Sequence, residues 1–198
     1  HIPLPYNCRI LDGEPGQIYL CEGVIDTLTL IEQGFPAVGV PGAANFKEAW
    51  AGLGVVYVNL KEYLQAEEAR KKALQINPNY AYALVGLGKV YNGLENYEKA
   101  IEYHTKALKI EPSNTFAMEQ IDYANFQLAI RDNDQGDALL KQQQYEKARA
   151  LFKSSIAKWQ KLPQPYFNLY LIAFNLDNDY KAAHDYLAKA MELNPQDS

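Results

Sequence analysis

The chain has 198 residues, of which 48% are hydrophobic and 22% are charged, and its formal net charge at pH 7 is −5. This composition is typical of a globular protein with one or two domains. The acidic balance disfavours broad nucleic-acid binding, which requires clustered lysines and arginines against the phosphates. No apolar run reaches about 18 residues, so we expect no membrane span and a cytoplasmic location.

The cysteines and histidines do not form a recognisable metal-binding pattern. Cys8 and Cys21 lack the Cys-x-x-Cys spacing of a zinc site or a redox pair. His104 and His184 have no partner at the i+4 spacing of a helical metal site, so we expect them to be packed or exposed. These residues predict no metal site and no cofactor, in a reducing compartment. The sequence begins at His1 rather than at a methionine, and what precedes it is left open.

The first 48 residues predict a small α/β segment. QIYLCEG is a short apolar run bounded by turn residues and is expected to form a buried strand. VIDTLTLIEQG, residues 24–34, is expected to form a helix that ends at Gly34. PAVGVPG predicts a second strand, and this strand–helix–strand order is typical of a parallel βαβ unit. CRIL, residues 8–11, can supply a further strand.

Two motifs in this segment carry a family resemblance. CEGVIDTLTL, residues 21–30, and VPGAANF, residues 40–46, resemble the toprim domain of bacterial primases and primase-helicases. The resemblance implies that Glu22 is an acid/base or metal-associated residue. It also implies that Asp26 stands at an acidic position that follows this glutamate.

The second toprim motif is missing from the sequence. In that family an Asp-x-Asp on a later strand holds magnesium, and a lone carboxylate binds this ion poorly. The register of that strand falls here on VVYVNLKEY, where Asn59 and Lys61 stand at the aspartate positions. We therefore interpret Glu22 and Asp26 as remnants of a site. The chain is predicted to have no catalytic residue, no bound metal and no enzymatic activity.

The rest of the chain is repetitive. Residues 49–78 align with residues 83–112 at a constant offset of 34 residues, which indicates an internal repeat. Each copy predicts two antiparallel helices, with small residues where the helices approach and a proline that ends the second helix. The identical pairs are Leu53 and Leu87, Gly54 and Gly88, Tyr57 and Tyr91, Tyr63 and Tyr97, Ala66 and Ala100, Ala73 and Ala107, and Pro78 and Pro112.

This pattern resembles the tetratricopeptide repeat. The family motif W-x-x-L-G-x-x-Y is met by Trp50, Leu53, Gly54 and Tyr57. The resemblance implies a mainly α fold, an α-solenoid of about four helix-turn-helix repeats, preceded by the partial βαβ, toprim-like segment.

The expected domains follow from the two resemblances. About 14 extra residues separate the second and third repeats, and they predict either an additional helix or one long helix that runs to about Gln143. The predicted boundaries are 1–48 for the toprim-like segment and 49–198 for the repeat domain, with repeats at about 49–79, 81–113, 132–163 and 164–196 and the extra helix at 114–131.

Stacked helix pairs also imply a concave groove, lined by the first helix of each repeat, that binds peptides. Asparagine recurs there, and its amide can both donate to and accept from a peptide backbone. The alternative is that Asn59 and Asn92 only end their helices. Lys89 is the only basic candidate, which disfavours a ligand held by its C-terminal carboxylate. The predicted groove residues are Val55, Asn59, Tyr82, Lys89, Asn92, Asn168, Ile172 and Asn175.

The charged run EEARKK, residues 67–72, is expected to lie on a solvated helix face. Glutamates three and four residues before basic side chains form ion pairs on such a face. The run therefore predicts no binding site.

The predicted function is a protein–protein interaction scaffold that binds a peptide or partner protein in the concave groove. A second hypothesis is a magnesium-dependent DNA primase or DNA-processing factor whose toprim site another chain completes. A third is a non-functional fusion of two segments. The partner's identity and the oligomeric state do not follow from the sequence.

Overall fold

The computed structural model describes most of the repeat region and three short strands before it. Asp26 and the helix expected over residues 24–34 lie outside the described residues. Contacts divide the chain into two compact units, residues 1–120 and 121–198, and each is described by itself. The predicted division at residue 48 stays a prediction. The described residues are 8–10, 19–22, 37–40 and 46–194.

A small sheet belongs to the first unit. Its strands are β1 (Cys8–Ile10), β2 (Tyr19–Glu22) and β3 (Ala37–Val40), in the order β1-β2-β3. β1 and β2 run antiparallel, whereas β2 and β3 run parallel. The strands expected from QIYLCEG and PAVGVPG are thus present and parallel, and CRIL supplies the third. The toprim-like fold itself is not shown, because the helix expected between β2 and β3 is not among the described residues.

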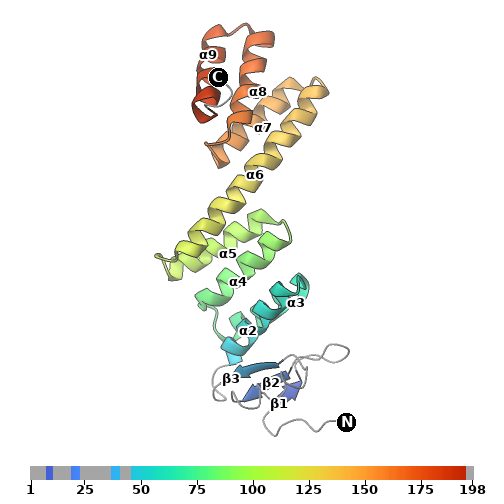
Figure 1. Cartoon of the computed structure of the whole chain (residues 1–198), viewed down its shortest axis with the longest axis vertical. Helices are drawn as coiled ribbons and strands as arrows, with labels where there is room; N and C mark the ends of the chain where they lie inside the picture. The colour runs from blue at the N-terminus through green and yellow to red at the C-terminus, as the bar shows by residue number, and fades with distance from the viewer. Residues whose placement is uncertain (1–7, 11–18, 23–36, 41–45, 195–198) are drawn as a thin grey trace. The chain divides into compact units, whose positions relative to one another are not determined.

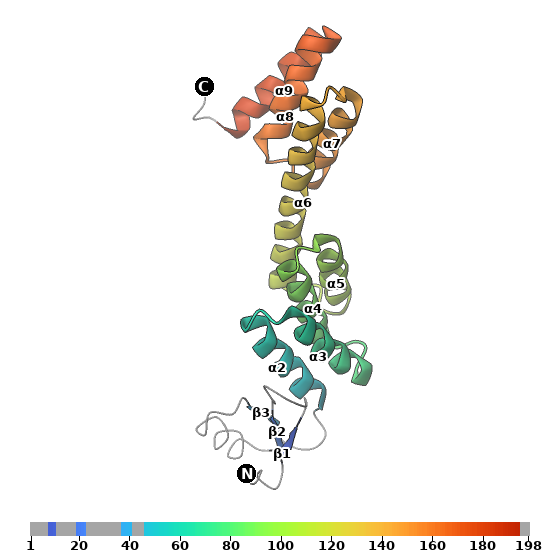
Figure 2. The ribbon, with the colours of Figure 1, turned by 90° about the vertical axis from the view of Figure 1, so that its right-hand side faces the viewer.

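Two helix pairs follow in the first unit (Figures 1 and 2). They are α2 (Phe46–Asn59) with α3 (Tyr63–Ile76), and α4 (Ala81–Gly93) with α5 (Tyr97–Ile110). The leucines and alanines of the aligned repeats form the core of these pairs, as predicted, because their spacing places them on one face of each helix. The residues with no exposed area are Leu53, Leu87, Ala66, Ala100, Ala73 and Ala107.

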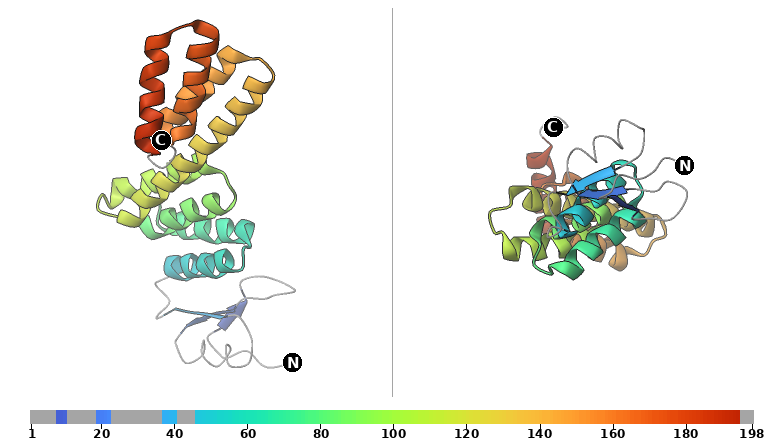
Figure 3. Two further views of the ribbon diagram at one scale, coloured as in Figure 1. Left: turned by 45° about the horizontal axis from the view of Figure 1, so that its top comes forward. Right: turned by 90° about the horizontal axis from the view of Figure 1, so that it is seen from below.

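The second unit takes up the C-terminal part of α6 (Thr115–Lys141) and three further elements of helix. These are α7 (Tyr145–Lys158), α8 (Pro163–Ile172), which continues into the π-helical turn η1 (Ala173–Asp177), and α9 (Tyr180–Leu193). Figure 3 shows α8 and α9 side by side, connected by a tight turn. Its core contains Ala148, Phe152, Leu169 and Ile172.

α6 is one helix of 27 residues. The separate helix predicted over 114–131 is therefore a correction, and the alternative of one long helix is the observed arrangement. The turn-like letters RDNDQGD lie inside the helix, because their polar side chains are satisfied by the neighbouring helices. Asp132 pairs with Lys158 of α7, and Asn133 accepts a hydrogen bond from Asn168 of α8.

The turn between the two helices of each repeat contains a left-handed residue. Lys61, Glu95, Gln143 and Asn178 have φ angles of 61°, 57°, 60° and 55°, and each lies two residues before its second helix begins. In the first three turns the next amide closes a six-residue loop, as when Glu62 N donates to Tyr57 O at 2.8 Å. This is the hydrogen bond of a Schellman motif. The last turn is wider, because η1 intervenes.

The glycines of the repeat are required by a side chain from the paired helix. A Cβ at Gly54 would lie 2.6 Å from Nε of Arg70, and one at Gly136 would lie 2.5 Å from Cε1 of Phe152. A Cβ at Gly88 would overlap the ring of His104. The close approach predicted for Gly54 and Gly88 is therefore confirmed, and in each case the approaching side chain lies 16 residues later.

Candidate protein-binding surface

In the first unit the predicted groove residues lie on α2 and α4. Asn59 and Lys89 are exposed, and Val55 is half-buried. Tyr82 is 51% exposed. Asn92 is half-buried, and its amide donates to Oε1 of Gln120 at 3.0 Å. The structure therefore leaves four of these side chains partly or fully accessible and engages Asn92 within the unit.

Arg70 is a residue that sequence reasoning placed wrongly. It is only 4% exposed, although the run around it was expected to be solvated. Its side chain packs against Gly54 and Gly86, and Nη1 donates to the carbonyl oxygen of Tyr82 at 3.4 Å. Burial lowers the pKa of the guanidinium, and the Tyr82 ring, 4.9 Å from Cζ, offsets part of this cost through a cation–π contact.

The neighbours of Arg70 in the run behave as predicted. Lys71 pairs with Glu67 at 2.5 Å, and Lys72 pairs with Glu68 at 2.9 Å, each at i,i+4 spacing. The difference follows from helix geometry, because Arg70 lies four residues after the buried Ala66 and therefore on the core face. A reading by charge alone missed this signal.

His104 occupies the equivalent position in the second repeat. The side chain has no exposed area, and neither ring nitrogen has a hydrogen-bond partner among the described residues. Burial lowers the pKa of the imidazole to about 4. The ring packs on Gly88 and makes an edge contact with Phe116, with 6.4 Å between the centroids. The histidine is therefore a neutral packing residue, which is one of the two outcomes expected.

In the second unit Asn168 joins two helices. Its amide donates to Oδ1 of Asp137 at 2.7 Å and to Oδ1 of Asn133 at 3.2 Å, so α8 is tied to α6. Burial and the charge of Asp134 raise the pKa of the Asp137 carboxyl. We call Asn133, Asp137 and Asn168 the amide–carboxylate cluster.

Two other predicted residues of the second unit do not form a groove with Asn168. Ile172 is 1% exposed and packs in the core with Ala148, Phe152 and Leu169, so its assignment to a binding surface is wrong. Asn175 is exposed, and its amide donates to the carbonyl oxygen of Leu171 at 3.0 Å. The register of η1 differs from that of a regular α-helix, and this difference was not visible in the sequence.

A pocket of about 520 Å³ adjoins the amide–carboxylate cluster. Asp137 and Asn168 form polar parts of its wall, and α8 and α9 supply a mostly apolar remainder. Sequence reasoning found Asn168 but missed the pocket, because its walls come from helices whose packing no local pattern encodes. The other lining residues are Pro163, Gln164, Phe167, Leu187, Ala190, Met191 and Asn194.

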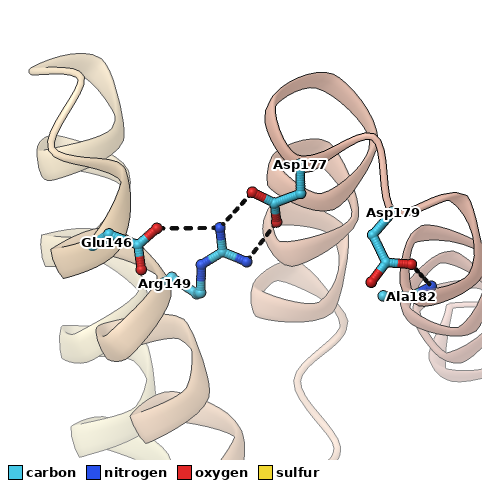
Figure 4. Close-up of polar contacts among 5 residues, drawn as sticks. All are labelled: Glu146, Arg149, Asp177, Asp179 and Ala182. Carbon is cyan, nitrogen blue, oxygen red and sulfur yellow. Dashed lines mark hydrogen bonds and ion pairs between the residues drawn. The ribbon is translucent and has the colours of Figure 1, made fainter.

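The acidic residues around Asn178 are structural. Figure 4 shows Asp177 in a two-pronged ion pair with Arg149 of α7, at 2.7 and 2.9 Å, while Glu146 contacts the same guanidinium. The carboxylate of Asp179 accepts from the backbone N–H of Ala182 and caps α9. The two aspartates were expected to lie in an interhelix turn rather than at a metal site, and each has a structural partner.

Two classes of site were searched for in the described part of the chain. There, no three histidine, cysteine, aspartate or glutamate side chains gather in a group that could hold a metal ion. Of the helices the structure describes, none combines the length and apolarity needed to cross a membrane.

Solved structures with a similar arrangement are repeat proteins of low sequence identity. A crystal structure of MamA is 21% identical, with 73% of this chain and 96% of that chain covered and a TM-score of 0.39. YrrB, described as a TPR protein with an unusual peptide-binding site, is 17% identical, with 75% and 86% covered and a TM-score of 0.39. PilF of Pseudomonas aeruginosa is 24% identical, with 75% and 61% covered and a TM-score of 0.34. No curated protein matches the chain.

Two family models match the sequence, and both are described as tetratricopeptide repeat. One matches residues 47–112 and the other matches residues 133–198, which together make up two thirds of the chain. Neither match reaches residues 1–46, so the toprim resemblance and the primase hypothesis gain no support from them. The matched segments coincide with the helix pairs described above. The chain therefore belongs to the tetratricopeptide repeat family.

Proposed function

We propose that this protein is an interaction scaffold that binds a polypeptide segment of a partner protein. The observation that carries the proposal is the amide–carboxylate cluster beside the pocket of the second unit. Binding sites in proteins are concave and mostly apolar, with a few polar groups that fix orientation. The pocket has this composition, because Asp137 and Asn168 stand at one side of a wall that contains Phe167, Leu187 and Met191.

The cluster favours a partner that offers hydrogen-bond donors. Asp137 has accepting capacity beyond its bond to Asn168, since a carboxylate has about four lone-pair positions. Backbone N–H groups and basic side chains supply such donors, whereas a free carboxylate would be repelled. The predicted groove residues Asn59, Tyr82 and Lys89 extend the proposal to the first unit, where their accessible side chains offer further contacts.

A display experiment tests this proposal. Random peptides displayed on phage are selected on the purified chain, and synthetic copies of the selected peptides are measured by fluorescence anisotropy. Asn168→Ala is expected to weaken binding at least about tenfold, because a buried bond to a charged group contributes about 1.5–3 kcal/mol. Asn175→Ala is the control, since this amide bonds only within its own turn.

The outcome also depends on folding. Circular dichroism spectra of both variants are compared with that of the parent chain, so that loss of structure is recognised. If no peptide is selected, or if Asn168→Ala binds as well as the parent, the proposed surface is wrong.

A further inference from the structure

The open pocket has a filled counterpart in the first repeat. There Trp50, Ala51, Ala73 and Leu74 pack with two residues from the start of α4, Tyr80 and Ala83. The residues at the same repeat positions in the last repeat lie 117 residues later and line the pocket. They are Phe167, Asn168, Ala190 and Met191.

In the first unit the first turn of the following helix occupies this place. Ala83 is the third residue of α4, and it has no exposed area. Ala117 is the third residue of α6, lies 34 residues later, and also has no exposed area. The place thus accepts an alanine from the incoming helix in both repeats of the first unit.

The second residue of each incoming helix is aromatic and packs on one particular side chain. Tyr82 of α4 covers Arg70, with Cζ 4.9 Å from the ring centroid, and Phe116 of α6 contacts His104. Arg70 and His104 each follow a buried alanine by four residues, as Leu187 follows Ala183 in the last repeat. Leu187 lines the pocket, so the contact that an aromatic ring would cover is open there.

We propose that the pocket receives the first turn of an α-helix from a partner protein, with an aromatic residue at its second position and alanine at its third. The ring lies on Leu187 and the alanine on Ala190, as in the internal pairs. The inference rests on the proposed function and specifies the partner's secondary structure and two of its side chains. The carboxylate of Asp137 matches the positive end of the helix dipole, which enters here.

A second copy of this chain does not fit the same place. Its first repeat helix, α2, carries Ala49 at the third position, and this alanine is already 3% exposed within its own chain. The second position is Glu48 instead of an aromatic residue. The occupant is therefore a helix of a different protein that continues the stack of repeats.

Synthetic helical peptides test the inference with the full chain. The probe is an alanine-based amphipathic peptide that begins Asn-Glu-Tyr-Ala, labelled for fluorescence anisotropy. Met191→Asp on the exposed pocket wall is expected to weaken binding at least tenfold. Ala188→Asp, on an exposed part of the same helix, is expected to leave it within twofold. In the peptide, replacing the alanine by leucine or the tyrosine by serine is expected to weaken binding at least fivefold.

Two outcomes separate this inference from the proposed function. If the helical peptide does not bind, while an extended, proline-containing peptide from the display selection binds and is lost in Asn168→Ala, the scaffold function stands and the helix inference falls. If the helical peptide binds equally to Met191→Asp, the pocket is not its site and the inference falls too. If neither peptide class binds, both proposals fail.

Discussion

The two units build the same helix pair with opposite chemistry at one position. In the first unit the side chains that pack over the small residue of the first helix are Arg70 and His104, whereas in the second unit Phe152 does so. All three are buried, and all three face a glycine. The position therefore specifies volume and shape, and it accepts a polar group when the neighbouring helix supplies an aromatic ring. The first unit bears a desolvation cost that the second avoids.

The largest expected effect is the loss of the apolar side chain. Phe152→Ala is expected to lower the free energy of unfolding by about 3–5 kcal/mol, because it leaves a cavity beside Gly136 and Ile172. His104→Ala is expected to cost less, since it also removes two unsatisfied ring nitrogens from the core. Urea denaturation monitored by circular dichroism measures both. An equal cost for the two variants would contradict the contrast between the units.

Acid is expected to destabilise the chain through His104. The pKa of about 4 in the folded protein lies below the ordinary value of 6.5, so the unfolded chain binds the extra proton first. Stability is complete above pH 6.5 and falls as the pH drops toward 4, by about 3 kcal/mol over this range.

The variant His104→Phe isolates this contribution. The difference in unfolding free energy between it and the parent chain is expected to change with pH over that window. His184→Gln is the control, because the side chain of His184 is 81% exposed. A pH profile unchanged by His104→Phe would show that other groups cause the acid sensitivity.

A smaller, stabilising effect is expected at the left-handed turns. Glu95→Gly is expected to stabilise the chain by about 0.5–1 kcal/mol, because a side chain with a Cβ is strained at a φ of 57°. Asn178→Gly in the second unit should gain less, since asparagine tolerates this conformation. Thermal melting compares them, and Thr105→Gly within α5 serves as a destabilising reference. A larger gain at Asn178 than at Glu95 would reverse the expected order.

The smallest effect is expected at the surface ion pair of Arg149 and Asp177. Asp177→Asn is expected to lower the melting temperature slightly at low salt and less at high salt, because exposed ion pairs are screened. Asp185→Asn, which removes a neighbour of the exposed His184, is the matched control. A loss that persists at high salt would indicate that the pair acts by positioning η1 instead.

The sequence predicted the repeats well because their signals are local and recur. Gly54, Tyr57 and Ala66 return at one offset, and each is required by contacts within a helix pair. The parallel strands β2 and β3 were also predicted, from short apolar runs between turn residues.

The candidate site was predicted only in part. Asn168 was found, but Ile172 was assigned to the surface and Arg70 to solvent, because both depend on which face a neighbouring helix covers. The pocket depends on the last repeat having no following helix among the described residues, which is a tertiary fact. The length of α6 was left open, since the polar letters that suggest a turn are satisfied by side chains from α7 and α8.

The continuity of α6 limits how this protein can be divided. The border between the units falls at residues 120 and 121, in the middle of a helix of 27 residues. A fragment cut there would lose the backbone hydrogen bonds that cross the cut, and each piece would end in a frayed half-helix. A fragment of the first half should therefore retain α6 through Lys141, and a fragment of the second half should begin near Thr115. The overlap belongs to both, so the two halves share a component that neither can give up.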